Sequence, residues 1–355
     1  MKLTRRTLLQ TAAGTAAAST VAGCLDDISS ADANLDAGYA AFFTLWDWAE
    51  QVSGDAIDFE NPVGTGQAGH GWSPSGDLTR DIADAGVFVY FDTPAFSWAQ
   101  DVAATLESDY DTVAVIDGLE GLDDQLLGWD HETDSNDHGS EDNHSTETHD
   151  GHDHENEGDH DTETNDGHDH GEASIDPHVW LDPVLAGEIV ETIASGLADA
   201  DPDNAETYEE NAASYTTDLE SIDQQFTDLL ETADRHVAVF AGHDSFTYLQ
   251  DRYGFDIHTP VGVSPQEEPS ANDISETIEL VDSEGIETIL YDPFEDPDGA
   301  YPLVETILAE SDATDAMPIT HLSGTLSTWQ DEGWGYLEQM EEINIPAFRE
   351  VLDAQ

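Results

Sequence analysis

"TYEENAASYTTDLESIDQQFTDLLETA", residues 207–233, decides the architecture of this chain. Its apolar side chains follow one another at spacings of seven, four, three, four, three and four residues. This period places them on one face of an amphipathic helix. A helix of about 30 residues is about 45 Å long, which is long enough to run the height of a two-lobed protein. The members of the stripe are Tyr208, Tyr215, Leu219, Ile222, Phe226, Leu229 and Ala233.

Apolar runs on both sides of this helix predict two parallel sheets. "AGVFVYFD" (85–92) and "DTVAVID" (111–117) precede it, and "HVAVFA" (236–241) and "IETILYD" (286–292) follow it. Continuous apolar runs between turn formers suit strands that are buried on both faces, and their alternation with helical stretches is typical of α/β folds. We therefore expect two parallel-sheet α/β lobes joined by one long rigid helix. The expected boundaries are 1–24 for an export signal, 25–35 for a tether, 36–200 for the N-terminal lobe, 201–234 for the connecting helix and 235–355 for the C-terminal lobe.

The chain is extremely acidic, with 80 Asp and Glu residues against 7 Lys and Arg residues and a net charge of −73. Such a surface repels itself in dilute buffer, but molar salt shortens the Debye length to about 3 Å and screens the repulsion. We interpret the composition as an adaptation to brine, of the haloarchaeal kind. Nucleic acid and anionic membrane surfaces are excluded as partners, because the chain has almost no cations to neutralise phosphates.

The first 24 residues have the features of an export signal. The twin Arg5-Arg6 precedes a run of small and apolar residues, and the segment ends in Ala22-Gly23-Cys24. "TRRTLL" resembles a twin-arginine signal and "VAGC" resembles a lipobox. The alternative, a transmembrane anchor, is disfavoured because the run is short and poor in Leu and Ile against the roughly 20 apolar residues that a span needs. We expect export and lipid anchoring through Cys24 at the extracellular face of the cell membrane.

Residues 130–172 form a segment of a different kind. They contain nine of the 15 histidines and seventeen acidic residues, with no aliphatic side chain. Such a segment cannot bury enough apolar area to offset chain entropy, so we expect a disordered insertion within the first lobe. A solvated acidic loop is the simpler reading, but brine favours Asp and Glu, not His. The histidines instead indicate loose zinc collection.

Four of the six histidines outside the insertion share one context. His70 follows a glycine-rich turn, His178 precedes an Asp-Pro helix start, and His243 and His321 follow expected strands of the second lobe. Ligands bind beyond the carboxyl ends of strands in open α/β sheets, and imidazole is the commonest metal ligand. The sequence therefore predicts a metal site in a cleft between the lobes. The remaining candidates are interpreted as structural: His236, His258, Trp180 and Phe246.

The segments around these histidines resemble a known family. They are similar to the ligand motifs of the zinc/manganese solute-binding proteins of ABC importers, and the resemblance covers about residues 37–355. It implies two lobes with a long connecting helix and a metal site whose ligands are His70, His178, His243 and His321. The four segments are "VGTGQAGHGWSPSGDL" (63–78), "DPHVWLDP" (176–183), "AGHDSFTYLQDRYGF" (241–255) and "THLSG" (320–324).

The chain departs from the family pattern in two places. Members often have a carboxylate shortly before a glycine near the C-terminus, where His321 stands here. Asp292 in "YDPF" resembles another family position and is our second choice for the fourth ligand. Ahead of His70, Ala68-Gly69 replace the family's acidic residue and proline, so a carboxylate helper is missing there.

The donor set favours zinc over manganese, because imidazoles suit tetrahedral zinc while manganese prefers more oxygen donors. We expect a monomeric protein that captures Zn²⁺ and delivers it to an ABC permease, and not an enzyme. One alternative is a binding protein of the same type for manganese or another divalent metal. Two others belong to different classes, an extracellular zinc buffer or adhesin and a zinc hydrolase. A hydrolase needs an open coordination position, which a fourth ligand would close.

Overall fold

The computed structural model describes residues 35–67, 69, 71–128, 175–262, 268–294 and 299–355. The predicted signal with Cys24, the ligand candidate His70 and the histidine-rich insertion lie outside these residues. The chain divides into two units, Met1–Ala33 and Asn34–Gln355, and every element below belongs to the second. Among the described helices, none combines the length and the apolar character that crossing a membrane requires.

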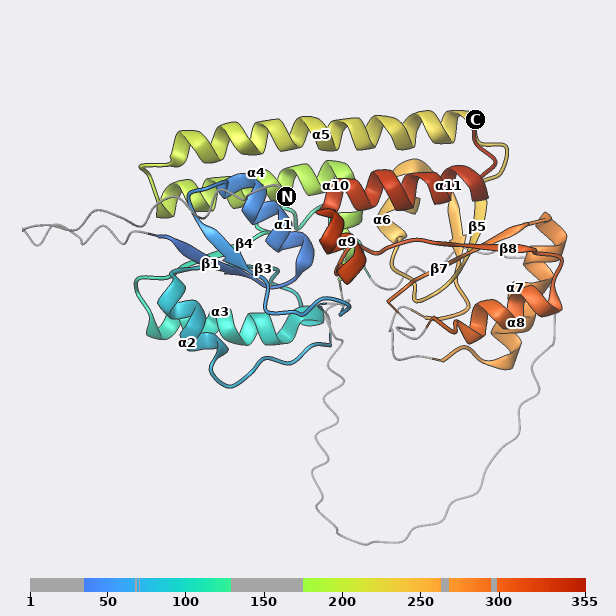
Figure 1. The fold of residues 1–355 in the computed structure, drawn as a ribbon, viewed down its shortest axis with the longest axis horizontal. Coiled ribbons are helices and arrows are strands. Elements are labelled where there is room, and N and C mark those ends of the chain that lie inside the picture. Colours follow the sequence, from blue (N-terminus) through green and yellow to red (C-terminus); the bar gives the residue numbers. More distant parts are fainter. Residues whose placement is uncertain (1–34, 68, 70, 129–174, 263–267, 295–298) are drawn as a thin grey trace, which may run out of the picture. The chain divides into compact units, whose positions relative to one another are not determined.

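The first sheet lies near the N-terminus of the described chain (Figure 1). It has four parallel strands in the order β2-β1-β3-β4. Every residue of β3 is buried, as predicted, but β4 is half-exposed along most of its length because it forms an edge of the sheet. Helices α1 and α4 cover one face, and α2 and α3 cover the other. The elements are β1 (Ala37–Ala40), α1 (Phe43–Ser53), β2 (Asp58–Glu60), α2 (Leu78–Ala85), β3 (Val87–Tyr90), α3 (Ser97–Asp109), β4 (Ala114–Asp117) and α4 (Pro183–Ala200).

The second sheet repeats the topology of the first. Its four strands are parallel in the order β6-β5-β7-β8, so the prediction of two parallel-sheet α/β lobes is confirmed. The chain steps outward from β5 to β6 and then returns to the other side with β7, which makes the β5–β7 boundary a switch point where ligands bind. The elements are β5 (Val237–Ala241), α6 (Thr247–Tyr253), β6 (Asp256–His258), α7 (Ala271–Glu284), β7 (Thr288–Tyr291), α8 (Pro302–Glu310) and β8 (Asp315–Pro318).

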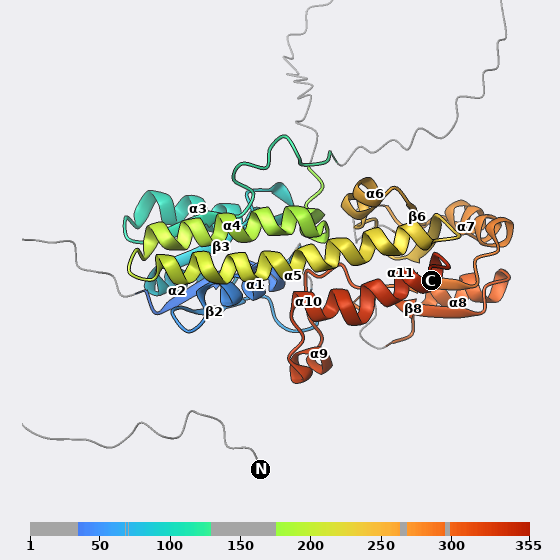
Figure 2. The same ribbon diagram turned by 90° about the horizontal axis from the view of Figure 1, so that it is seen from above.

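A C-terminal helical segment follows the second sheet. It begins with α9 (Ser327–Glu332) and α10 (Tyr336–Gln339). A π-helical turn, η4 (Met340–Asn344), then leads into α11 (Ile345–Val351). This segment packs along α5, beside the first lobe at α10 and beside the second at α11 (Figure 2).

The long helix α5 (Ala205–Thr232) runs along both lobes (Figures 1 and 2). All members of the predicted apolar stripe from Tyr208 to Leu229 are buried, whereas Ala233 lies just beyond the helix end. Near one end, Asn211 Nδ2 donates to the Val52 carbonyl of α1 at 2.9 Å. Toward the other end, Asp223 accepts from the Tyr253 hydroxyl of α6 at 2.9 Å. The helix is therefore attached to elements of both lobes.

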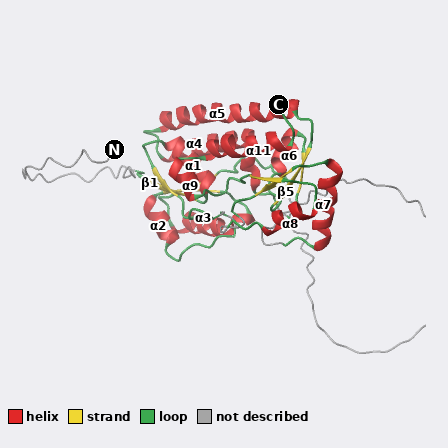
Figure 3. Cartoon of the chain, turned by 45° about the vertical axis from the view of Figure 1, so that its right-hand side comes forward, coloured by secondary structure: helices red, strands yellow, loops and turns green. Residues whose placement is uncertain are grey.

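The apolar core is continuous across the lobes. Its larger part starts between the first sheet and its helices, follows the buried face of α5 and ends around Phe246 and Phe348. A smaller cluster around Ile289 and Ile307 lies between the second sheet and helices α7 and α8. Figure 3 shows the strands enclosed by helices in both lobes.

Candidate metal site

His178 lies in a short turn between the first sheet and α4. It begins the 3₁₀ turn η3 (His178–Leu181) and is buried. Asp182 ends this turn and caps α4, because its Oδ1 accepts from the Val184 amide at 2.9 Å, and Pro183 occupies the first helical position. The predicted Asp-Pro helix start is therefore confirmed.

Asp176, the first residue of "DPHVWLDP", fixes the ring of His178. Its Oδ1 accepts from the His178 backbone N–H at 3.0 Å and lies 2.7 Å from His178 Nδ1. A carboxylate only accepts, so Nδ1 is the protonated nitrogen and Nε2 has the lone pair. Burial lowers the pKa of His178 despite the carboxylate. Burial opposes ionisation of Asp176, but the interactions with His178 outweigh it and lower the pKa of Asp176. The pair thus consists of a neutral imidazole and an ionised carboxylate, which is the arrangement of a metal-ligating histidine.

Three residues at the strand ends of the second lobe are buried near this ring. His243 follows β5 by two residues, Asp292 directly follows β7, and His321 follows β8 by three. The centroid of the His243 ring lies 5.5 Å from that of His178 and 5.4 Å from that of His321. Two imidazoles bound tetrahedrally to one zinc ion have centroids about 5 Å apart, from bonds of about 2.0 to 2.1 Å. The rings of His178, His243 and His321, which come from both lobes, thus form a buried row in which His243 neighbours the other two.

The spacing of these rings is close to that of a zinc site. Within the residues that the structure describes, no three His, Cys, Asp or Glu side chains are already arranged to hold an ion. The predicted ligand His70 lies outside those residues. Its neighbour Gly69 is buried, and a Cβ there would meet Phe42 at 2.6 Å. The Phe42 ring contacts Trp180, two residues beyond His178.

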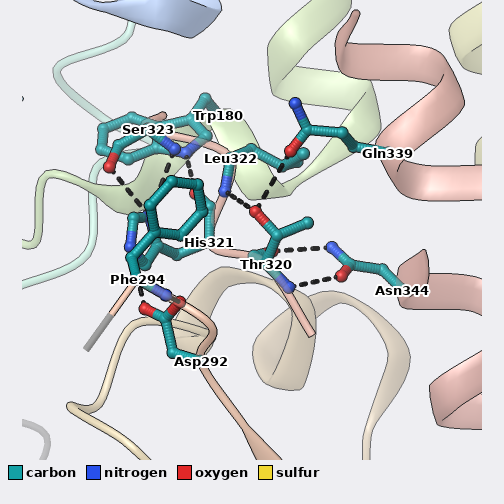
Figure 4. Close-up of polar contacts among 9 residues, drawn as sticks. All are labelled: Trp180, Asp292, Phe294, Thr320, His321, Leu322, Ser323, Gln339 and Asn344. Atoms are coloured by element: carbon teal, nitrogen blue, oxygen red, sulfur yellow. Dashed lines mark hydrogen bonds and ion pairs between the residues drawn. The ribbon is translucent and has the colours of Figure 1, made fainter. Parts of the chain in front are cut away.

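The two candidates for the fourth ligand form one buried pair (Figure 4). His321 Nε2 lies 3.0 Å from Asp292 Oδ2, and Asp292 Oδ1 accepts from the Phe294 amide at 2.8 Å. On the other side of the ring, Nδ1 accepts from the Ser323 amide at 3.2 Å. Because that amide can only donate, Nε2 holds the proton in this arrangement and donates to Asp292. The two carboxylates therefore face different ring nitrogens, since Asp176 contacts Nδ1 of His178 and Asp292 contacts Nε2 of His321.

The loop of His321 is held by the C-terminal helices. The side chain of Asn344 binds the backbone of Thr320, the residue before His321. Its Oδ1 accepts from the Thr320 amide and its Nδ2 donates to the Thr320 carbonyl, both at 2.8 Å. The following residue, Leu322, has a φ of 63°, a left-handed conformation that a bulky side chain rarely adopts. These contacts give the loop a specific shape rather than leaving it as a free connection (Figure 4).

The segment before His70 lies against the segment after His321. The Gly66 amide donates to the Thr325 carbonyl at 2.7 Å. A Cβ at Gly324 would stand 2.5 Å from the Gln67 carbonyl oxygen, so this close approach of two backbones needs a glycine. A cavity of about 260 Å³ opens beside this contact, and residues 61–67 and 324–330 contribute to its lining.

The two histidines interpreted as structural lie away from the ligand row. His236 precedes β5 and lies at its amino end, whereas His243 lies beyond its carboxyl end. His258 ends β6, and its Nε2 lies 2.8 Å from the Thr277 hydroxyl of α7. Burial lowers the pKa of His258. These positions agree with structural roles.

Sequence reasoning missed two side chains that shape the site. Asp176 had a readable signal, because a carboxylate two residues before a candidate ligand can reach its ring. Trp180 was assigned to the core, and it is fully buried, but its indole Nε1 also donates to the His321 carbonyl at 2.7 Å. Nothing in the sequence indicates that bond, since its partners are 141 residues apart.

Comparisons with known proteins identify the family of the chain. The family model "ZnuA: Zinc-uptake complex component A periplasmic" matches residues 39–350. The zinc-binding lipoprotein AdcA of Streptococcus pneumoniae (strain ATCC BAA-255 / R6) is 30% identical over 320 residues, which cover 88% of this chain and 55% of that protein. The chain therefore spans about half the length of the first such relatives.

A shorter relative and a solved structure match more completely. The high-affinity zinc uptake system protein ZnuA of Bacillus subtilis (strain 168) is 26% identical over 311 residues, covering 88% of this chain and 86% of that protein. The crystal structure of the Zn(II)-bound ZnuA-like domain of Streptococcus pneumoniae AdcA superposes with a TM-score of 0.66 at 26% identity. That match covers 90% of this chain and 99% of the domain.

Proposed function

The chain belongs to the zinc-uptake complex component A family, and from this premise we propose that it captures Zn²⁺ outside the cell and delivers it to an ABC-type permease. A component of this kind binds its cargo without transforming it, and the chain is not an enzyme. The relatives' names, which include a zinc-binding lipoprotein and a high-affinity zinc uptake protein, support zinc as the cargo.

The ligands proposed are His70, His178, His243 and His321, with Asp292 as second choice for the fourth position. The observation that supports this set most strongly is the buried row of imidazoles, with centroid distances of 5.5 and 5.4 Å, that joins His178 of the first lobe to two histidines of the second. Neutral imidazoles are good zinc donors, whereas manganese would favour a site richer in oxygen.

The fourth position is a choice between two members of one pair. His321 Nε2 and Asp292 Oδ2 are 3.0 Å apart, which is about the spacing of two atoms that share one zinc ion with bonds near 2 Å. In the proposed site His321 binds the ion through Nε2, while its Nδ1 stays beside the Ser323 hydroxyl, 2.8 Å away. Ligation by Asp292 itself is the alternative.

The attachment and setting of the protein are part of the proposal. Export by the twin-arginine signal and lipidation of Cys24 would hold a monomer at the extracellular face of the membrane, beside its permease. The lipoprotein among the relatives supports an anchor. The excess of 80 acidic over 7 basic residues supports a working environment of high salt, in which such a surface is screened.

The nine histidines of residues 130–172 favour a second candidate function, an extracellular zinc buffer or adhesin. Deleting this segment separates the two. A buffer should lose nearly all of its zinc capacity, whereas a solute-binding protein should keep one tight equivalent in a calorimetric titration at high salt. If the shortened chain binds no tight equivalent of zinc, delivery to a permease is refuted as the function. Residues 130–172 would then store zinc themselves rather than collect it for a separate binding site.

A further inference from the structure

Two successive carbonyl groups of the His321 loop are held by side chains of the first lobe. The His321 carbonyl accepts from Trp180 Nε1 of η3 at 2.7 Å, and the Leu322 carbonyl accepts from the Thr44 hydroxyl near the start of α1. All four residues are buried. We name this set of two bonds the carbonyl latch.

The donors of the latch are themselves fixed within well-packed surroundings. The Trp180 ring lies 4.9 Å from Phe42 and 6.0 Å from Phe91, measured between ring centroids. Its carbonyl accepts from the Tyr336 hydroxyl at 2.7 Å. Thr44 is in the first turn of α1, whose preceding residue, Phe42, contacts Trp180. The two donors therefore belong to one packed unit.

The acceptors lie where the backbone needs support. Leu322 has a left-handed φ of 63°, and its amide donates to the Thr320 hydroxyl at 3.0 Å. Conformations of this kind persist where the surroundings hold them in place, and they are frequent at ligand-binding sites. Here the amide of Leu322 is bound within its own loop, and the bond from Thr44 holds the carbonyl of Leu322. Release of the latch would leave the His321 backbone without its first-lobe support.

We propose that Thr44 and Trp180 are positioning residues that fix His321 opposite His178 and thereby slow the release of bound zinc. The inference rests on the proposed function, because it concerns the same metal. Neither donor touches the ion. Each bond joins the two lobes, so a movement that separates the backbone of the His321 loop from the first lobe must break both.

The test compares latch variants with matched controls. Thr44→Val and Trp180→Phe each remove one bond of the latch while keeping most of the side-chain volume. Ser53→Ala removes another buried hydroxyl bond of α1, to the Ile57 carbonyl at 3.1 Å, and Trp46→Phe removes another indole bond, to the Phe59 carbonyl at 2.8 Å. Thr44→Ser keeps the hydroxyl and should restore the wild-type behaviour.

The readouts are the rate of zinc transfer to an excess of chelator, followed by stopped flow in high salt, and the visible spectrum of the Co²⁺-loaded protein. Each latch variant should release zinc about fivefold faster, the equivalent of about 1 kcal/mol for one net hydrogen bond, and should alter the Co²⁺ spectrum. Ser53→Ala and Trp46→Phe should lower the melting temperature but keep the release rate within about twofold of wild type.

Three results would overturn the latch. Release at the wild-type rate in Thr44→Val is one, and equal acceleration in the controls is another. The third is failure of Thr44→Ser to behave as wild type, and this Thr44 series decides the matter even if Trp180→Phe does not fold. All variants lack residues 130–172, and tight binding of one zinc ion by the otherwise unchanged chain separates these outcomes from a failure of the proposed function, in which this shortened chain would retain none.

Discussion

Replacing Asp176 with Asn keeps the shape of the side chain and removes its charge. In the wild type, Asp176 Oδ1 accepts from the backbone N–H of His178 at 3.0 Å and lies 2.7 Å from its Nδ1. A hydrogen bond to a charged group contributes about 1.5 to 3 kcal/mol, against about 0.5 to 1.5 for a neutral one. The substitution should therefore cost about 1.4 kcal/mol of zinc binding, which raises the Kd about tenfold. Loss of an orienting carboxylate commonly has an effect of about 10- to 100-fold.

The assay is a chelator-competition titration of the chain without residues 130–172, in high salt. Asp117→Asn is the matched control, because Asp117 Oδ1 also accepts two amide bonds, from Asp92 and Leu119, both at 3.0 Å. Its Kd should stay within about twofold of wild type. The reasoning is refuted if Asp176→Asn binds zinc as tightly as wild type, or if Asp117→Asn weakens binding by the same factor.

Three further predictions concern the proposed ligands and the buried carboxylate Asp47 of α1. His178→Ala should weaken zinc binding by at least about 100-fold, whereas His152→Ala in the insertion should change it little, and calorimetry on the full-length chain that gives equal losses would count against the site. His321→Ala should weaken binding more than Asp292→Ala, and the reverse order in the same titration would make Asp292 the fourth ligand. Burial raises the pKa of Asp47 from 3.8 to about 6. Between these two pH values the folded chain therefore binds a proton that the unfolded chain has released. The free energy of unfolding should fall by up to about 3 kcal/mol as the pH rises from the lower value to the higher. Asp47→Asn should remove this decline in denaturant titrations at pH 4.5 and 7.5 in high salt, and an unchanged difference between the two pH values would show that Asp47 is not its source.

Much of the fold could be predicted from the sequence because its signals are local. The spacing from Tyr208 to Leu229 defines the buried face of α5, and the runs that form β3, β5 and β7 are apolar except for Thr288. The position of a strand within its sheet is not local. β4 has a similar apolar run but lies at an edge, since an apolar run does not reveal how many neighbours a strand has.

The same division applies to the site. That His243 and His321 approach one another could be predicted, because both follow parallel strands of one sheet, whose carboxyl ends lie on the same side. His178 belongs to the other lobe, and its place beside them is expected from the resemblance to the family. The partners of these histidines could not be predicted. The bond from Trp180 to the His321 carbonyl joins residues that only tertiary packing brings together. Asp292 and His321 are alternatives in the sequence, but in the structure their side chains contact each other. This contact depends on how far β7 and β8 each extend along the sheet before they end.

The central claim is that imidazoles from both lobes bind a single zinc ion. It is tested most directly by metal analysis and zinc-edge X-ray absorption of the purified chain lacking residues 130–172. The account predicts one zinc per chain, with at least three imidazole nitrogens at about 2.0 to 2.1 Å. A chain that retains no stoichiometric zinc, or a zinc ion surrounded mainly by oxygen atoms, would contradict it.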